Sequence, residues 1–479
     1  MRVVVVGNGM AGARVAAEVH GRCSDAKVTV LGAEPHRAYN RILLSSVLAG
    51  KVRETEVQTA DAAGHGLDVR VGVSVTRIDR ATRTVHCGEG EAVEYDQLVL
   101  ATGSRALVPP LPGLALEALP PNIAVFRTLD DCRRILAATV TARTVTVLGG
   151  GLLGLEAARG LAARGLRVQI VHAVGHLMER QLDPGAGAVL VGTLRRLGIT
   201  ARLDAAATAV DAGADGVRLT LADGGQVQAD VLVVACGVRP ETDLARAAGL
   251  AVGRGVLVDD QMRTNDPRVF AIGDCAEHAG IVSGLVAPAW EQARVAAQAI
   301  AGQSGARYRP PPTITRLKAA GIDLAAMGDP AAAGDALDAE ELSFADPSRG
   351  TYARLLIVND RVHSAIMLGD NPAVGTVVQL FDRGSPVPVD RRALLLGRSV
   401  GARSAAVESP ALMPDTVTVC QCNAVRKGDI VRCWRAGAAS VGDVVAQTRA
   451  TTGCGTCREA VDGIVDWLST VDPQEGAAA

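Results

Sequence analysis

The sequence predicts an α/β protein with two parallel-sheet domains, a small α+β domain and a short helical C-terminal module. A glycine-rich turn between an apolar strand and an alanine-rich helix occurs twice, at residues 7–12 and 149–154, and this repetition predicts the paired sheets. Four cysteines near the C-terminus, as a C-x-C pair and a C-x-x-C pair, mark the separate module. They are Cys420, Cys422, Cys454 and Cys457.

Length and composition set the class of protein. The 479 residues allow about three or four domains, and a hydrophobic content of 48% supplies real cores. A net charge of −2 and an aromatic content of 2% argue against a nucleic-acid partner. The chain opens on an apolar strand and has no run of ~18 apolar residues, so the sequence predicts a cytoplasmic protein without a membrane partner. Cytoplasmic thiols stay reduced, which favours ligand or core roles for the ten cysteines.

The first unit runs from a strand at residues 2–6 through a glycine turn and a helix to a strand at 28–31. Its turn has the Gly-x-Gly-x-x-Gly spacing that brings backbone amides at a helix N-terminus to a pyrophosphate, which predicts a Rossmann-like dinucleotide-binding domain. Glu34 follows at the spacing of a ribose-binding acid. The candidate residues of the turn are Gly7, Gly9, Met10, Ala11 and Gly12.

A second unit repeats the pattern with a strand at 144–148, a helix at 155–164 and a strand at 167–171. Gly149, Gly151 and Gly154 form its fingerprint. The second strand ends in His172, where an acid would accept the ribose hydroxyls of NADH. His172, or nearby Arg180, can instead meet the 2′-phosphate of NADPH, so the sequence leaves the coenzyme open. A solvated loop position for His172 is equally compatible with the sequence.

Two further strands end in small-residue turns that allow a close approach to a ligand. One turn is Ala101, Thr102 and Gly103, and the other is Gly273 and Asp274, whose carboxylate can accept a hydrogen bond from a ribityl hydroxyl. Strands at 313–317, 342–344, 352–358 and 361–368 predict the small α+β domain. Residues 398–415 are rich in serine, alanine and proline and predict a linker.

The cysteine module, residues 416–471, can hold a [2Fe–2S] cluster with two sulfurs on each iron, or one tetrahedral zinc. Zinc sites commonly use two C-x₂₋₄-C knuckles, so C-x-C and the dinucleotide sites upstream favour the cluster. Five basic residues give either a solvated face or a surface for an anionic cluster or acidic partner. They are Arg426, Lys427, Arg432, Arg449 and Arg458. The remaining cysteines are scattered, as expected of core residues. They are Cys23, Cys87, Cys132, Cys236, Cys275 and Cys433.

Over nearly its whole length the chain resembles the flavoprotein reductases with two dinucleotide-binding domains. The resemblance implies an FAD domain at 1–112 and 240–309, an NAD(P)H domain at 113–239 and an interface domain at 310–397. It places FAD on the first fingerprint and the turns at Ala101 and Gly273. It adds Glu156 and Gly237 to the NAD(P)H site.

Residues 39–46, 285–293 and 315–318 are similar to the N-terminal part of bacterial NAD(P)H nitrite reductase large subunits. The tail is similar to the [2Fe–2S] domain of bacterioferritin-associated ferredoxin. This resemblance implies that Arg41 lies near the FAD pyrophosphate and Trp290 near the flavin. It leans toward NADH, although His172 in place of an acid departs from that preference.

No sirohaem-binding half follows the cysteine module, so the chain resembles the electron-transfer subunit of bacterial assimilatory nitrate reductase. That subunit feeds electrons to a separate molybdenum subunit. A sirohaem nitrite reductase, another ferredoxin-like acceptor, and a non-catalytic flavoprotein with a zinc tail are the alternatives. Residues 33–60 contain no cysteine, and Ser46 stands where related peroxidases carry one, so thiol chemistry at the flavin is excluded.

Overall fold

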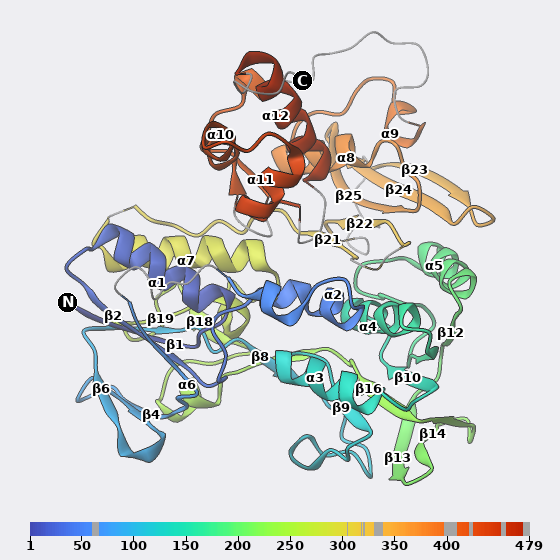
Figure 1. Ribbon diagram of the computed structural model, residues 1–479, viewed down its shortest axis with the longest axis horizontal. Helices are drawn as coiled ribbons and strands as arrows, with labels where there is room; N and C mark the ends of the chain where they lie inside the picture. Colours follow the sequence, from blue (N-terminus) through green and yellow to red (C-terminus); the bar gives the residue numbers. More distant parts are fainter. Residues whose placement is uncertain are drawn as a thin grey trace. The chain divides into compact units, whose positions relative to one another are not determined.

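The computed structural model describes residues 1–59, 67–303, 305–317, 319, 321–329, 339–396, 410–420, 425–451 and 457–472 (Figure 1). The chain divides into two compact units, Met1–Leu395 and Leu396–Ala479. The first unit contains three sheet domains, and the second is small and mainly helical. The predicted fold class is confirmed.

The first sheet is parallel, with the strand order β19-β7-β1-β2-β3. Its strands are β1 (Arg2–Val6), β2 (Lys27–Gly32), β3 (Asp68–Val71), β7 (Gln97–Leu100) and β19 (Val269–Ala271). The last four residues of β1 are buried, as expected of a central strand covered on both faces. Helices α1 (Met10–Arg22) and α7 (Val286–Ile300) lie side by side on one face (Figure 1). Because β19 and α7 come from far along the chain, this domain is discontinuous.

The second sheet has the parallel order β12-β11-β10-β16-β9. Its strands are β9 (Ile123–Val125), β10 (Thr144–Leu148), β11 (Arg167–Val171), β12 (Ile199–Arg202) and β16 (Val231–Val234). Its helices are α3 (Leu129–Ala138), α4 (Leu152–Ala163) and α5 (Pro184–Arg196), and a meander of β13 (Ala207–Gly213), β14 (Gly216–Leu221) and β15 (Gln226–Ala229) adjoins it. The two domains are joined by the antiparallel pair of β8 (Ser104–Ala106) and β17 (Val238–Pro240).

The third domain is an antiparallel sheet with the order β21-β22-β25-β24-β23, covered by α8 (Val374–Arg383). Its strands are β21 (Ile314–Arg316), β22 (Leu324–Met327), β23 (Glu340–Asp346), β24 (Thr351–Val358) and β25 (Arg361–Leu368). Asp183, the N-cap of α5, accepts a 2.8 Å hydrogen bond from the Tyr352 hydroxyl and forms an ion pair with Arg354. These contacts attach the third domain to the second.

The C-terminal unit contains β26 (Thr418–Cys420), β27 (Val425–Arg426), α10 (Lys427–Arg435), α11 (Val441–Thr448) and α12 (Arg458–Val471) around its own apolar core. Lys427 is buried, its Nζ donates a 2.6 Å hydrogen bond to the carbonyl of Met413, and its ammonium lies 4.8 Å from the centre of the Trp467 ring. The end of the predicted linker, residues 410–415, therefore packs on this unit.

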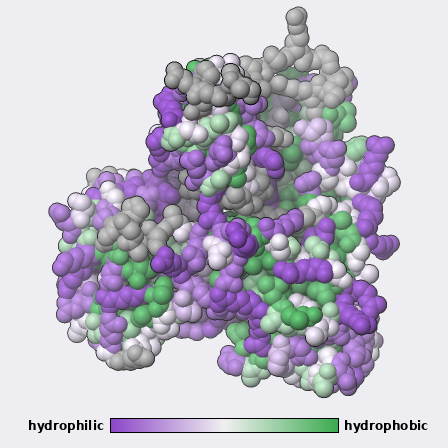
Figure 2. All heavy atoms as spheres, in the orientation of Figure 1, coloured by the Kyte–Doolittle hydropathy of each residue, from purple (hydrophilic) through white to green (hydrophobic). Residues whose placement is uncertain are grey.

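The visible face of the molecule mixes polar side chains with scattered apolar ones (Figure 2). Within the part of the chain that the structure describes, no helix combines the length and the apolar character needed to cross a membrane.

Candidate functional site

Both glycine loops follow a strand at which the strand order of the sheet reverses. β1 lies between β2 and β7, and β10 lies between β11 and β16. At such a switch point, the connections from the two neighbouring strands leave in opposite directions, so a ligand can enter between the carboxyl ends. The topology therefore places one dinucleotide site at each loop.

The first and third glycines of each loop are required by packing. Gly7 has φ +111°, and a Cβ built on it would lie 2.2 Å from the carbonyl oxygen of Ala101. A Cβ on Gly12 would lie 1.8 Å from the oxygen of Gly7. Gly149 and Gly154 repeat this geometry at 2.3 and 2.1 Å from backbone oxygens. A larger residue at Gly7 or Gly149 would collide with the backbone that follows the neighbouring strand, and one at Gly12 or Gly154 would push the helix away from the loop.

The middle glycines have a different role, because protein packing does not require them. A Cβ on Gly151 would meet no atom within 4 Å, and one on Gly9 would meet the Nε of Arg41 at 4.0 Å. Both residues are N-caps of helices with φ near −80°, where any side chain is allowed. The space that a side chain would fill lies before a helix N-terminus, which fits the pyrophosphate of a bound dinucleotide.

Asp274, which the sequence predicts at the flavin side of the first site, follows β19. Its Oδ2 accepts hydrogen bonds from the Ser104 hydroxyl at 2.9 Å and from Nη2 of Arg127 at 2.5 Å. Arg127 was not predicted from the sequence. The sequence feature that could have indicated it is a single arginine between a buried apolar strand and Thr128, the N-cap of α3. Its position ties the predicted Asp274 turn to the turn after β7.

Helix α7 holds the same turn from the other side. The backbone N–H of Gly273 donates a 2.7 Å hydrogen bond to Oε1 of Gln292, which is buried. Trp290 lies two residues earlier on α7, with the Arg14 guanidinium 5.8 Å from its ring centre. Proximity of Trp290 to the flavin stays a prediction.

Glu34 and Arg41, which are predicted to contact the ribose and the pyrophosphate of FAD, lie together in the structure. Glu34 accepts a 2.7 Å hydrogen bond from the Tyr39 hydroxyl and forms an ion pair with Arg41. Nη1 of Arg41 donates to the carbonyl of Arg127 at 3.3 Å, and its Nε is the atom nearest to the open space at Gly9. Burial raises the pKa of Tyr39, so its hydroxyl stays protonated and donates to Glu34. The arrangement supports the predicted place of Arg41 beside the phosphate loop.

Substitution of Arg127 is expected to weaken FAD retention. In Arg127→Gln, Asp274 loses its countercharge beside a site for an anionic dinucleotide. A charge-assisted contact is worth about 1.5–3 kcal/mol, so we expect FAD to dissociate about tenfold to 100-fold more readily. Flavin fluorescence released on dilution measures this. Arg134→Gln is the control, because Arg134 lies in helix α3, which follows Arg127, and donates to the backbone carbonyls of Leu119, Pro120 and Ile123; equal loss from both variants would contradict the assignment.

At the second loop, His172 is buried rather than solvated. Its Nδ1 accepts a 3.1 Å hydrogen bond from the N–H of Gly150, and its Nε2 lies 3.0 Å from the carbonyl oxygen of His176. Nε2 therefore carries the ring proton. The reading of His172 as a solvated loop residue is wrong, because the ring packs against the glycine loop.

The other predicted residues of this site are placed as follows. Glu156 is buried in α4, and the carbonyl of Gly237 accepts a 2.9 Å hydrogen bond from the N–H of Leu107 at the link between the two domains. Arg180 is exposed. A contact of each with the coenzyme stays a prediction.

In the C-terminal unit, Cys420 at the end of β26 and Cys457 at the N-cap of α12 are both buried in the core. Cys422 and Cys454 lie outside the described residues, so the structure describes half of the predicted ligand set. Cys433 is buried within α10, and burial raises the pKa of its thiol. Among the residues that the structure describes, no group of His, Cys, Asp or Glu has the geometry of a metal site.

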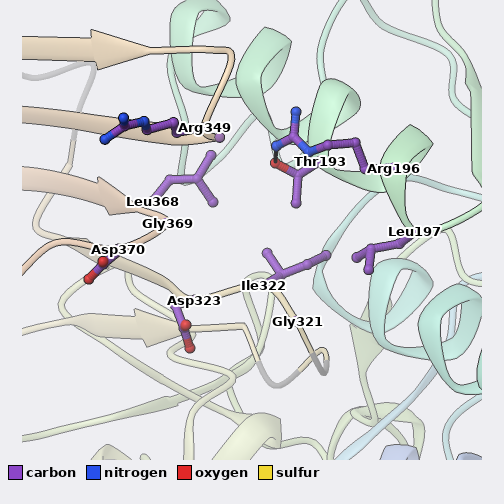
Figure 3. Close-up of a pocket in the computed structure, with 11 residues that line it drawn as sticks. Thr193, Arg196, Leu197, Gly321, Ile322, Asp323, Arg349, Leu368, Gly369 and Asp370 are labelled. Atoms are coloured by element: carbon purple, nitrogen blue, oxygen red, sulfur yellow. Dashed lines mark hydrogen bonds between the residues drawn. The ribbon is translucent and has the colours of Figure 1, made fainter.

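A pocket of about 250 Å³ lies between α5 and the third domain (Figure 3). Arg196 lines it and donates to the hydroxyl of Thr193 at 2.9 Å and to the carbonyl of Pro347 at 3.4 Å. None of its lining residues belongs to a glycine loop, so this pocket is separate from both predicted dinucleotide sites.

Comparison with known proteins agrees with this organisation. Residues 1–299 match the pyridine nucleotide-disulphide oxidoreductase family, 313–383 the rubredoxin NAD+ reductase C-terminal domain, and 418–467 the BFD-like [2Fe-2S] binding domain. The chain is 34% identical to the nitrite reductase [NAD(P)H] of Bacillus subtilis over 97% of its length and 57% of that protein. It is 33% identical to the assimilatory nitrate reductase electron transfer subunit of the same organism over 98% of its length and 60% of the relative.

The chain thus spans little more than half the length of these curated relatives. Among solved structures, the covalent putidaredoxin reductase–putidaredoxin complex superimposes with a TM-score of 0.73 and 25% identity, covering 81% of this chain and 94% of the other. The predictions of FAD, NAD(P)H and a [2Fe–2S] cluster as cofactors are confirmed. The chain belongs to the pyridine nucleotide-disulphide oxidoreductase family, as an FAD-dependent NAD(P)H oxidoreductase with a [2Fe–2S] domain.

Proposed function

We propose that this protein passes electrons from NAD(P)H, by way of its C-terminal cluster, to a separate catalytic subunit, that of an assimilatory nitrate reductase. The observation that carries the proposal is the union in one chain of two dinucleotide loops and a compact unit with buried thiols. A reductase that delivered hydride directly to its substrate would not need a one-electron carrier.

The two glycine loops and their neighbouring side chains bind and orient the two dinucleotides. The loop with Gly9 holds FAD, with Arg41 at its phosphates and Asp274 at its ribityl chain, and the loop with Gly151 holds NAD(P)H. FAD, when bound, supplies the exchange between a two-electron hydride and single electrons, and the cluster supplies one-electron transfer. Ser46, in α2 (Leu44–Leu48), offers no thiol, so thiol–disulfide chemistry is not part of the function.

The relatives support two partners. The relative named as an assimilatory nitrate reductase electron transfer subunit favours a nitrate reductase, for which we propose a molybdenum subunit. The nitrite reductases, with similar identity, favour a nitrite reductase, and a sirohaem enzyme is that alternative. Identity and coverage are nearly equal for the two kinds of relative, and we place nitrate first because the relative named as an electron transfer subunit carries the role that we propose for this chain. Nitrite reductase or another ferredoxin-like acceptor is the alternative.

Reconstitution tests the partner. The protein with NADH is expected to reduce neither nitrate nor nitrite alone, because the oxygen-atom and six-electron chemistry needs molybdenum or sirohaem. Addition of a molybdenum nitrate reductase subunit should produce nitrite from nitrate at a rate that depends on both proteins. Turnover of either anion by the isolated chain would contradict the proposal. A response to a sirohaem partner alone would establish the nitrite alternative.

A further inference from the structure

The segment after β11 folds back onto the second glycine loop. The N–H of Met178 donates a 3.0 Å hydrogen bond to the carbonyl of Gly150, whose own N–H donates to Nδ1 of His172. Leu177 and Met178 are completely buried, and a Cβ on Gly150 would lie 2.4 Å from the Leu177 side chain. The backbone immediately before the next residue, Glu179, is therefore fixed relative to the loop.

Glu179 places its carboxylate at the end of β11. Its Oε2 lies 3.2 Å from Nε2 of His172, the nitrogen that carries the ring proton, while 41% of the Glu179 side chain remains exposed. One oxygen of this carboxylate thus lies against the His172 ring, while the side chain as a whole stays accessible to a ligand. In a dinucleotide-binding domain, the end of this strand is where an acid meets the ribose of the coenzyme.

We propose that Glu179 makes the protein selective for NADH, supplying the ribose-binding carboxylate that His172 cannot. The inference rests on the proposed use of the second loop for NAD(P)H. The carboxylate accepts hydrogen bonds from the ribose hydroxyls of NADH and repels the 2′-phosphate of NADPH.

The charges near this segment support the same selection. A Cβ on Gly175 would lie 3.4 Å from a carboxylate oxygen of Asp204, so a second acid faces the segment. Arg202, at the end of β12, is already paired with Asp223 at 2.7 Å. Arg180, the next residue in the sequence, is exposed and positively charged. If Glu179 did not determine the coenzyme preference, Arg180 could bind the 2′-phosphate of NADPH.

Two substitutions test the assignment in the full-length, cofactor-loaded protein with ferricyanide as acceptor. Glu179→Gln should raise the ratio of kcat/KM for NADPH to that for NADH by about tenfold or more, since one charged contact is removed. Glu179→Arg should raise the ratio further and tighten inhibition by 2′,5′-ADP. Asp215→Asn, which removes an exposed acid at the β13–β14 turn of the same domain, should leave the ratio unchanged.

The outcomes distinguish a role of Glu179 in coenzyme selection from a role in holding the His172 ring. If Glu179 served only to hold His172, kcat/KM for both coenzymes would fall together, and an unchanged ratio in both variants would overturn the inference. If the wild-type protein oxidises NADH but substitution of Glu179 leaves the NADPH-to-NADH ratio of kcat/KM unchanged, only the assignment of Glu179 is overturned. A wild-type protein that neither oxidises NADH nor binds 2′,5′-ADP would overturn the proposed function as well.

Discussion

Gly151→Val is expected to abolish oxidation of NAD(P)H while the protein keeps its FAD and its fold. A Cβ at this position would meet no atom within 4 Å, and the extended backbone of Gly151 accepts any residue. Valine in place of glycine as the N-cap of α4 costs about 1 kcal/mol of stability. The same side chain fills the space through which the pyrophosphate reaches the backbone amides of α4. Loss of two hydrogen bonds from these amides to the charged pyrophosphate corresponds to about 100-fold weaker binding of NAD(P)H or more.

Anaerobic bleaching of the flavin by NADH measures this loss, and flavin content and melting temperature measure the fold. Gly154→Ala is the matched variant, because its added methyl would lie 2.1 Å from the oxygen of Gly149. That variant should melt at a lower temperature, whereas Gly151→Val should keep the wild-type transition within a few degrees. NADH oxidation by Gly151→Val with an unchanged KM would contradict the assignment of the second loop.

Central parallel strands were predictable to the residue. The expected strands at 2–6, 144–148 and 167–171 coincide with β1, β10 and β11. After Arg2, β1 is a continuous apolar run, as expected of a strand that is buried on both faces, whereas β10 (Thr-Val-Thr-Val-Leu) and β11 (Arg-Val-Gln-Ile-Val) mix buried aliphatic residues with polar ones. Glycine turns end β1 and β10. Where a buried apolar strand is followed directly by a glycine turn, the sequence is sufficient to predict the boundaries of the strand.

Other strands depend on partners that a sequence does not show. β22 was missed because its sequence, Leu-Ala-Ala-Met, has no β-branched residue and no alternation of apolar and polar residues. Its strand exists because it pairs with β25, with Leu324 opposite Leu368, and because all four of its side chains are buried. Tertiary pairing determines this element, whereas local propensity does not predict it.

The site divides in the same way. Glycine spacing predicted Glu34, which follows from the geometry of a βαβ unit, and the small-residue turn after a strand predicted Asp274. Arg127 was missed because its contact with Asp274 joins residues 147 positions apart. The position of His172 was predictable, but the direction of its ring was not, since its partners Gly150 and His176 are set by how the segment after β11 folds.

Loss of the cluster with retention of flavin is the expected result of either Cys420→Ser or Cys457→Ser. Iron and acid-labile sulfide should fall from about two of each per chain to near zero, because a serine hydroxyl does not replace a thiolate ligand. Cys457 caps α12, whose N-terminus carries partial positive charge and stabilises a thiolate there. Because ligand binding and folding are coupled, the C-terminal unit of these variants should also melt earlier.

Cys433→Ser is the matched control, since it removes a buried thiol from the same small core. Cys433 lies inside α10, away from a helix N-terminus, and the apolar surroundings that raise its pKa favour the neutral thiol over the thiolate ligand. This variant should lose some stability but keep its iron, its visible absorbance and its electron transfer to the partner. Iron retained in Cys457→Ser, iron lost equally in Cys433→Ser, or stoichiometric zinc without iron in the wild-type protein would each contradict the ligand set of Cys420, Cys422, Cys454 and Cys457.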